Sequence, residues 1–258
     1  RCRRSDLRNS VMEWHQQYIA QTRWTRAIAS YLFPKFNLPE SRLALEVGCG
    51  TGAALQEILQ PHHLRCFGVD INDEYLSFAR QYLSEPRLIQ ADAHRLPIAS
   101  HSFDLSFCHF LLLWVSEPVA VLAEMVRVTR HGGIVLALAE PDHGSRIDFP
   151  PELSILGKWQ FESLHQQGAD PTLGRQLRAL FSKSGLIDAE AGILGGEWSS
   201  KSELSDFESE WQVLQSDLTH DIDKSSQLTT LKKIDSNARQ SGERILFVPT
   251  FYAWGRVP

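Results

Sequence analysis

Residues 43–52 read LALEVGCGTG, and AALQEIL, with helical spacing, follows directly. The apolar run ends at Glu46, and Gly48, Gly50 and Gly52 alternate behind it. Glycine adopts backbone angles that other residues resist, and it lets the chain pass close to a ligand. The start of the following helix offers unpaired N–H groups and the positive end of the helix dipole. The pattern indicates a buried strand, a tight turn and a helix, and it predicts a nucleotide-like cofactor.

The spacing of the glycines distinguishes two kinds of cofactor. Dinucleotide-binding loops follow the order GxGxxG, whereas the order here is GxGxG and position 53 is Ala. A pyrophosphate needs converging backbone N–H groups, but a cofactor that ends in an amino acid needs a carboxylate for its ammonium group. Glu46, two residues before Gly48, meets that need. The loop therefore disfavours a nicotinamide-dependent oxidoreductase.

Two further acidic residues stand at the ends of apolar segments. LRCFGVD (64–70) ends at Asp70, and RLIQAD (87–92) ends at Asp92. The carboxyl ends of parallel strands line one crevice in a doubly wound sheet. There Asp70 can accept hydrogen bonds from both hydroxyls of a ribose, and Asp92 with the backbone N–H of Ala93 can pair with the amino edge of an adenine. Together with Glu46, these residues predict a single cofactor site.

At this point the chain resembles a known family, the class I S-adenosylmethionine-dependent methyltransferases, and is nearest to the branch that methylates quinones and natural products. The resemblance is carried by LEVGCGTG (45–52), GVDIN (68–72), QADAHRLPIASHSFDLSFCHFLLLWV (90–115) and EMVRVTRHGGIVLALAEPD (124–142). It implies S-adenosylmethionine as the cofactor. It also implies an α/β fold, a Rossmann-like, doubly wound, seven-stranded sheet with an antiparallel last strand. We expect RILFVPTFYAWG (244–255) to form that strand.

The resemblance also implies roles for individual residues. It assigns Glu46, Gly48, Cys49 and Gly50 to the methionine portion of the cofactor, Asp70 and Ile71 to the ribose, Asp92 and Ala93 to the adenine, and His109 to the surroundings of the reactive sulfonium. We interpret Cys49 as a small spacer and not as a nucleophile.

Composition limits the class of protein. The 258 residues are 43% hydrophobic and 22% charged, as in ordinary globular domains, and the net charge is −5. Tight nucleic-acid binding leaves a basic footprint, so no nucleic-acid partner is expected. The four cysteines have no metal-ligand spacing, which predicts no metal site and favours a reducing, cytoplasmic location. No apolar run is long enough to cross a bilayer, and no membrane partner is expected.

Three segments are additional to the predicted cofactor-binding core (42–142), within a single methyltransferase domain of residues 1–258. An amphipathic helix over 10–33 is expected to act as a lid, with Tyr18, Gln21 or Arg23 reaching the cofactor carboxylate or the acceptor. The insertions 143–173 and 197–243 have helical sequence patterns. Unstructured loops of that length are also unusual in a compact domain. We expect them to form a helical cap over the acceptor site.

The cap region is rich in aromatic residues, namely Trp159, Phe161, Trp198, Phe207, Trp211, Phe251 and Tyr252. They favour a small, apolar or aromatic acceptor, although a role in the core of the cap explains them equally well.

Candidate general bases near strand ends are His109, Glu140, Asp142 and His143. Each has a structural alternative: Glu140, for example, could cap a helix or pair with an arginine such as Arg146. The expected function is methyl transfer to a small molecule. The alternatives are a non-catalytic, S-adenosylmethionine-binding regulatory protein and a methyltransferase that acts on protein or nucleic acid.

Overall fold

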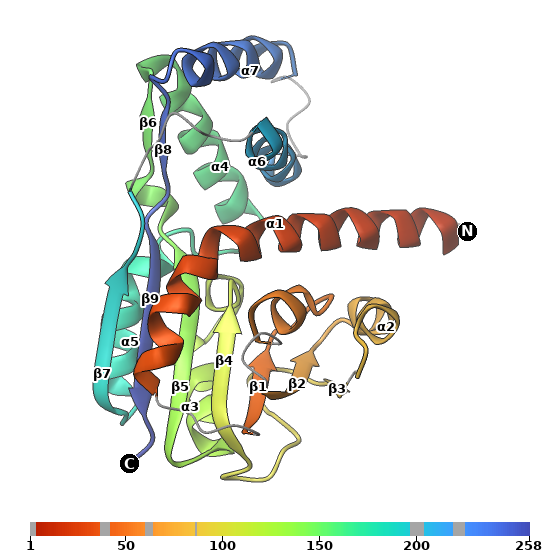
Figure 1. Cartoon of the computed structure of the whole chain (residues 1–258), viewed down its shortest axis with the longest axis vertical. Coiled ribbons are helices and arrows are strands. Elements are labelled where there is room, and N and C mark those ends of the chain that lie inside the picture. Colours follow the sequence, from red (N-terminus) through yellow and green to blue (C-terminus); the bar gives the residue numbers. More distant parts are fainter. Residues whose placement is uncertain (1–3, 37–41, 60–63, 86, 197–203, 219–224) are drawn as a thin grey trace.

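The computed structural model of the protein describes residues 4–36, 42–59, 64–85, 87–196, 204–218 and 225–258. Seven strands form one sheet in the order β3-β2-β1-β4-β5-β9-β7 (Figure 1). They are β1 (Leu43–Val47), β2 (Arg65–Asp70), β3 (Leu88–Gln90), β4 (Phe103–His109), β5 (Thr129–Pro141), β7 (Ile187–Ile193) and β9 (Thr250–Arg256). Strands β1 to β5 pair in parallel, and β9 is antiparallel to both β5 and β7. The predicted Rossmann-like sheet with an antiparallel last strand is confirmed.

The direction of the strand order changes at β1. This strand pairs with β2 on one side and with β4 on the other, and its residues Ala44, Leu45 and Val47 are fully buried. A central parallel strand has both faces covered, which explains its continuous apolar sequence. A crevice opens at the carboxyl ends of the strands where the order reverses. The glycine loop and His109, the last residue of β4, therefore lie at the same edge of the sheet.

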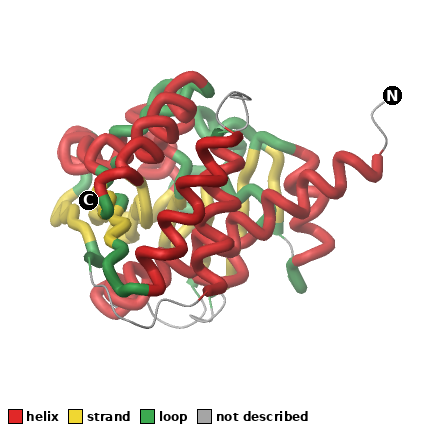
Figure 2. The backbone as a smooth tube through the Cα atoms, turned by 90° about the horizontal axis from the view of Figure 1, so that it is seen from above, coloured by secondary structure: helices red, strands yellow, loops and turns green. Residues whose placement is uncertain are grey.

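Helices cover both faces of the sheet, and the strands lie between them when the molecule is seen from above (Figure 2). Helices α3 (Pro118–Val128) and α5 (Leu177–Lys183) place Met125 and Phe181 in one hydrophobic cluster. Helix α2 (Asp73–Tyr82) and the π-helical turn η1 (Leu55–Leu59) place Leu76 and Ile58 in another, which also holds the end of α1. The short 3-10 helices are η3 (Leu112–Trp114), η4 (His143–Ser145), η5 (Pro151–Leu153) and η6 (Leu173–Gln176).

Helix α1 (Arg4–Phe36) extends beyond the predicted limits of 10–33 at both ends. Its last turns pack on the sheet, where Ile28, Leu32 and Phe36 are buried. The rest of the helix crosses above the carboxyl ends of β4, β1 and β2 (Figure 1). The chain thereby places one helix between the sheet and the segments above it.

Above α1 stand the helices α4 (Ser154–Gln166), α6 (Leu204–Asp217) and α7 (Ser225–Gln240), with a two-stranded antiparallel sheet of β6 (Ile147–Phe149) and β8 (Ile245–Phe247) (Figure 1). We call these five elements the upper segment. Its own hydrophobic cluster is formed by Leu153, Leu156, Trp159, Phe207, Trp211, Leu214, Leu218 and Leu231. Parts of the predicted insertion 197–243, at 197–203 and 219–224, lie outside the described residues.

The last predicted strand, 244–255, is in fact two strands. β8 pairs with β6 in the upper segment, and β9 joins the main sheet. Pro249 lies between them, and proline cannot donate a hydrogen bond to a strand ladder, which explains the break. One continuous segment thus joins the sheet to the upper segment. Within the described residues, no helix has the length and apolar content that a membrane span requires.

Candidate active site

A cavity of about 660 Å³ lies between the carboxyl ends of the strands, α1 and the upper segment. The glycine loop, Asp70 and His109 line its lower part. Residues of α4, α6 and β8 line its upper part. The cavity is therefore continuous from the predicted cofactor loop to the predicted cap.

The glycine loop has the backbone conformation that its sequence predicts. Gly48, Gly50 and Gly52 have φ values of +77°, +51° and +81°, a region that residues with a Cβ atom rarely adopt. A Cβ atom on Gly48 would lie 2.7 Å from Cδ1 of Leu111. This position therefore favours glycine for its conformation, and a Cβ atom here would displace the end of the Leu111 side chain.

Glu46 lies at the floor of the cavity and is buried, and its Oε2 atom has no hydrogen-bond partner. Burial raises the pKa of Glu46 well above its usual range, and the neighbouring charge of Asp70 adds to that effect. A buried acceptor without a donor costs free energy until a donor arrives. The atom therefore fits the ammonium group of an amino-acid cofactor.

Asp70 ends β2 at the wall of the same cavity. Its Oδ2 accepts a hydrogen bond from the N–H of Gly50 at 2.7 Å, and its Oδ1 accepts one from the N–H of Asn72 at 2.8 Å. Asn72 in turn caps α2, since its side chain accepts from the N–H of Glu74 at 2.9 Å. Burial raises the pKa of Asp70. One carboxylate thus fixes both the glycine loop and the start of α2.

Three of the predicted cofactor residues lie outside the cavity. Ile71 is 68% exposed, and the side chain of Asp92 is 56% exposed. An Asp92 oxygen accepts hydrogen bonds from the N–H of His94 and lies 2.7 Å from its Nδ1, and these contacts lower the pKa of Asp92. Ala93 is partly buried against the main hydrophobic cluster. The structure brings Glu46, the glycine loop, Asp70 and His109 together, with Ile71, Asp92 and Ala93 at an open surface.

Of the predicted lid residues, Tyr18 and Gln21 line the cavity, whereas Arg23 is exposed and does not. The Tyr18 ring covers the glycine loop, 3.4 Å from where a Cβ atom of Gly50 would be. It packs edge-on against Tyr75 of α2, with ring centroids 6.2 Å apart. Burial raises the pKa of the Tyr18 phenol.

Two contacts hold α1 against the site, and neither was predicted from the sequence. His15 Nδ1 lies 2.8 Å from the hydroxyl of Thr51, and the Thr25 hydroxyl lies 2.8 Å from Nε2 of His109. His15 and Thr25 are buried. Polar residues on the buried side of an amphipathic helix interrupt its apolar stripe. This interruption could have identified His15 and Thr25 from the sequence.

The candidate bases fall into two groups. Glu140 and Asp142 are buried outside the cavity. Glu140 accepts hydrogen bonds from the N–H groups of Leu111, Leu112 and Leu113, at 3.0, 2.8 and 3.2 Å, and so caps the start of η3. Burial raises the pKa of Glu140 to about 8, against the effect of these donors. Asp142 forms a two-point ion pair with Arg175 of η6, with N–O distances of 2.5 and 2.7 Å.

His109 and His143 do line the cavity. Burial lowers the pKa of His109 to about 3. Burial and the charge of Arg146 lower the pKa of His143 to about 4, although Asp142 and a hydrogen bond with Gln160 oppose this. The Nδ1 atom of His143 is buried and has no partner. Both rings are therefore neutral near pH 7, and His143 keeps a ring nitrogen without a hydrogen bond.

The aromatic residues that the sequence predicted for the cap lie in different parts of the structure. Of the predicted cap aromatics, Trp211 lines the cavity, Trp159 and Phe207 pack inside the upper segment, and Trp198 lies outside the described residues. Phe161 belongs to α4, and Phe251 and Tyr252 belong to β9. Other aromatic rings also line the cavity, among them Trp14, Trp24, Trp114 and Phe247.

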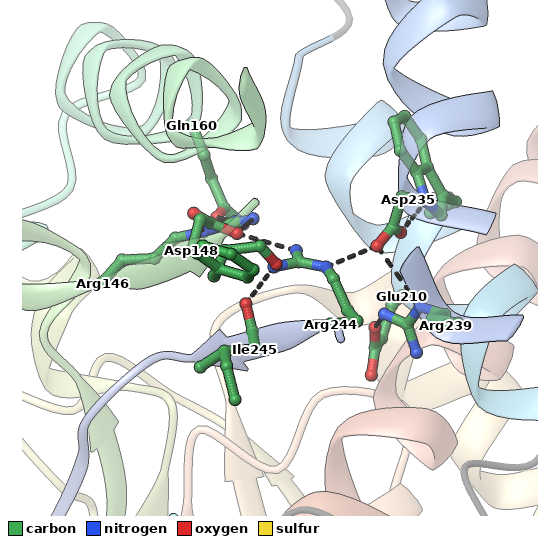
Figure 3. A network of polar contacts seen from close by, with 10 residues as sticks. Arg146, Asp148, Gln160, Glu210, Asp235, Arg239, Arg244 and Ile245 are labelled. Atoms are coloured by element: carbon green, nitrogen blue, oxygen red, sulfur yellow. Dashed lines mark hydrogen bonds and ion pairs between the residues drawn. The ribbon is translucent and has the colours of Figure 1, made fainter. Parts of the chain in front are cut away.

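A buried network of charged side chains lies behind the upper wall (Figure 3). Asp148 binds Arg146 at 2.7 Å and Arg244 at 2.7 Å. Asp235 binds Arg244 and Arg239, and it accepts a hydrogen bond from the Trp211 indole at 2.6 Å. The network joins Asp148 to Arg244 across 96 positions of the sequence, and its members share no motif, so it could not be predicted from the sequence.

Comparisons with known proteins agree with this geometry. A family profile described as a methyltransferase domain matches residues 45–137. The demethylmenaquinone methyltransferase of Geobacillus stearothermophilus is 30% identical over 206 residues, covering 72% of this chain and 84% of that protein. A phosphatidylethanolamine N-methyltransferase of Cereibacter sphaeroides is 39% identical over 98 residues, covering 36% of this chain and 47% of that protein. Five curated relatives are matched over only 35% to 61% of their own lengths.

Among solved structures, the phosphoethanolamine N-methyltransferase 2 of Haemonchus contortus, in complex with phosphomonomethylethanolamine and S-adenosylhomocysteine, has the same fold. Its TM-score is 0.59 at 16% identity, over 93% of this chain and 57% of that chain. The chain belongs to the class I S-adenosylmethionine-dependent methyltransferases. Family and cofactor are thus as predicted, and a quinone methyltransferase is among the relatives.

Proposed function

We propose that this protein transfers the methyl group of S-adenosylmethionine to a small molecule that binds beneath the upper segment, which acts as a cap. The observation that carries the proposal is the single cavity that joins the glycine loop to α4, α6 and β8. An acceptor in its upper part and a cofactor in its lower part would meet without crossing solvent. Exclusion of water favours methyl transfer over side reactions. The thiols of Cys49, Cys66 and Cys108 are free, which supports a cytoplasmic location.

The cofactor would lie along the predicted residues. Glu46, with its unpartnered Oε2, would hold the ammonium group, and Gly48 and Gly50 would let the backbone approach the methionine portion. Asp70 would accept from the ribose hydroxyls. Asp92 and Ala93, outside the enclosed cavity, would contact an adenine at the open edge of the site.

Helix α1 would act as the lid of this site. The Tyr18 ring lies against Gly50, in the place proposed for the methionine portion. Either the ring rotates or α1 shifts when the cofactor enters. Gln21, which lines the cavity, would then reach the cofactor carboxylate or the acceptor, whereas the exposed Arg23 does not line it.

S-adenosylmethionine supplies a methyl group on a positively charged sulfur that leaves as a neutral thioether. The protein has to align the acceptor with that methyl group, and alignment contributes on the order of 7–11 kcal/mol. His143 is the favoured general base because its Nδ1 is neutral and unpartnered. His109 is bonded to Thr25, and Glu140 caps η3. His143 would accept the proton of the acceptor, a contribution of roughly 10²–10⁴-fold in rate.

Two alternatives make different predictions. A non-catalytic regulatory protein would bind the cofactor but methylate nothing. A methyltransferase that acts on protein or nucleic acid would need an open groove or a basic face, and the net charge of −5 does not favour one.

The test is a calorimetric titration with S-adenosylmethionine, S-adenosylhomocysteine and NAD, followed by methyl transfer from a labelled donor to a panel of small acceptors. We expect the two sulfur compounds to bind and NAD not to bind. Binding of NAD alone would contradict the proposal, and cofactor binding without transfer to any acceptor would favour the regulatory alternative. With an acceptor identified, His143→Gln should slow transfer at unchanged cofactor affinity, and the exposed His165→Gln should not.

A further inference from the structure

The upper wall of the cavity contains an unequal number of opposite charges, and two of its carboxylates, Glu210 and Asp217, are half-buried. Within the described residues, the network of Figure 3 and its neighbours comprise three guanidinium groups and four carboxylates, namely Arg146, Arg239, Arg244, Asp148, Glu210, Asp217 and Asp235. Buried charges are costly unless each is compensated by an opposite charge or by hydrogen bonds. The network is therefore one cation short of neutrality.

Three of the four carboxylates have guanidinium partners. Asp148 binds Arg146 and Arg244, Asp235 binds Arg244 and Arg239, and Glu210 binds Arg239. The side chains of Arg146 and Arg244 are only 7% and 6% exposed, so these pairs are enclosed. The charges of these three carboxylates are therefore compensated by arginines of the wall itself.

Asp217, at the end of α6, is the fourth carboxylate. Its Oδ2 accepts a hydrogen bond from Nε2 of Gln160 at 2.7 Å. In the described part of the chain, no Lys or Arg nitrogen lies within ion-pair distance of it. Asp217 lines the cavity, and burial raises its pKa to about 6. Near pH 7 it therefore presents a negative charge to the cavity, and Arg146 acts on this charge without forming an ion pair with it.

A second acceptor stands beside the same glutamine. Gln160 Oε1 accepts from Arg146 at 2.6 Å, while its Nε2 donates to Asp217, so the orientation of the amide is fixed. His143 also contacts Gln160, and its buried Nδ1 has no partner. Asp217 and His143 thus place two groups in need of a hydrogen-bond donor on one wall.

We infer that the acceptor substrate carries a protonated amine, which Asp217 binds in the upper part of the cavity. This inference rests on the proposed function, because it concerns the acceptor of that reaction. An ammonium group has a positive charge and three N–H donors, so it satisfies Asp217 and a neighbouring acceptor together. A carboxylate or phosphate brings no donor and is repelled by Asp217.

The rest of the acceptor would be apolar. Trp211 and Leu214 of α6, Leu156 of α4 and Trp24 of α1 line the same cavity. Aromatic faces also attract cations. The acceptor class is then an amine on an aromatic or aliphatic body, which modifies the purely apolar acceptor that the sequence suggested.

The experiment compares three probes of similar size on the protein saturated with S-adenosylhomocysteine, by calorimetry near pH 7. The probes are 2-phenylethylamine (cation), 2-phenylethanol (neutral) and 3-phenylpropionate (anion). We expect the amine to bind about tenfold more tightly than the alcohol, as for a hydrogen bond to a charged group, and the anion to bind most weakly. Equal binding of amine and alcohol, no binding of the amine, or preference for the anion would each overturn the inference.

Asp217→Asn keeps the shape of the side chain and removes its charge. It should reduce amine affinity about tenfold and leave the alcohol unchanged. The matched control is Glu208→Gln, an exposed acid of the same helix that pairs with Lys232 outside the cavity. Unchanged amine affinity in Asp217→Asn would also overturn the inference. The comparison of probes on the unaltered protein decides the question even where the variant fails to fold.

The two proposals fail separately in this design. Binding of S-adenosylhomocysteine, measured first, tests the cofactor site. If the cofactor product binds and the amine shows no preference, the amine inference is wrong while the proposed function stands. If the cofactor product does not bind, the proposed function fails at that step, before any probe is titrated, and the amine inference fails with it.

Discussion

Nδ1 of His15, on helix α1, lies 2.8 Å from the hydroxyl oxygen of Thr51 in the glycine loop. The His15 ring packs between Phe78 and Tyr82 of α2, with centroids at 4.7 and 4.2 Å. A single side chain therefore connects the helix above the site with the loop and helix below it. The lid proposed for α1 is anchored at this contact.

Thr51→Val tests the anchor, because valine keeps the shape of threonine and removes the hydroxyl. The buried His15 ring would lose its partner, at a cost of about 1–3 kcal/mol in the free energy of unfolding. Urea denaturation measures the change. Ser77→Ala, which removes a hydroxyl at an exposed position of α2, is the control and should change stability by less than about 0.5 kcal/mol. Equal stability of the two variants would show that the contact between His15 and Thr51 does not stabilise the fold.

The site residues that could be predicted best from the sequence are the acidic residues that follow an apolar strand. Glu46 and Asp70 each follow an apolar run, and parallel strands bring such ends to one edge. Glu140 shows the limit of this argument. It also ends a strand, yet its carboxylate turns to the N–H groups of Leu111 and Leu112 and leaves the cavity. Nothing local to residue 140 specifies a partner 28 residues earlier.

The upper segment was predictable only as helices. Arg244 meets Asp148 across 96 positions and Asp235 across nine, and these contacts depend on how β8, α7 and β6 pack. Helical and strand periodicity reports the buried face of an element but not its neighbour. The division of residues 244–255 into two strands was not predicted for the same reason. Neither β6 nor β8 shows in its own sequence that it pairs with the other strand.

Asp70→Ala tests the proposed ribose contact. Loss of hydrogen bonds to a charged group should weaken the binding of S-adenosylhomocysteine by roughly 1–3 kcal/mol, which calorimetry would measure. Glu85→Ala, an exposed acid after α2, serves as the control. Unchanged affinity in Asp70→Ala would make the ribose assignment wrong. Thermal unfolding should be recorded alongside, because Asp70 also accepts from Gly50 and Asn72.

Gly48→Ala and Gly132→Ala form a matched pair. Their φ values are +77° and +72°, so both substitutions carry the cost of a left-handed conformation, about 1–2 kcal/mol. Only at Gly48 would the new Cβ atom meet a neighbour, Cδ1 of Leu111 at 2.7 Å; at Gly132 nothing lies within 4 Å. We expect Gly48→Ala to be the less stable variant in urea and to bind S-adenosylhomocysteine more weakly. Similar losses of stability in both variants would mean that the Leu111 side chain moves aside at no cost in free energy.

Asp235→Asn tests the buried network of the upper segment. Asp235 is 2% exposed and binds Arg239, Arg244 and the Trp211 indole. Removal of one partner from a buried ion pair leaves an uncompensated charge, and the expected loss is about 3–5 kcal/mol in the free energy of unfolding. Glu208→Gln removes a carboxylate from an exposed pair with Lys232 and should cost no more than about 1 kcal/mol. A small loss in Asp235→Asn would indicate that solvent reaches the two guanidinium groups.

The pH dependence of stability tests the burial of His109. Its pKa is lowered to about 3 in the folded protein, against the ordinary value of 6.5 in the unfolded chain. As the pH falls below 6.5, the unfolded chain binds a proton that the folded protein refuses, so stability decreases until about pH 3. The loss from this residue is about 2 kcal/mol at pH 5. His109→Asn removes the titrating group, so the gap in unfolding free energy between the variant and the unaltered protein should change by that amount between pH 7.5 and pH 5. A constant gap for His109→Asn would mean that solvent protonates the ring in the folded state.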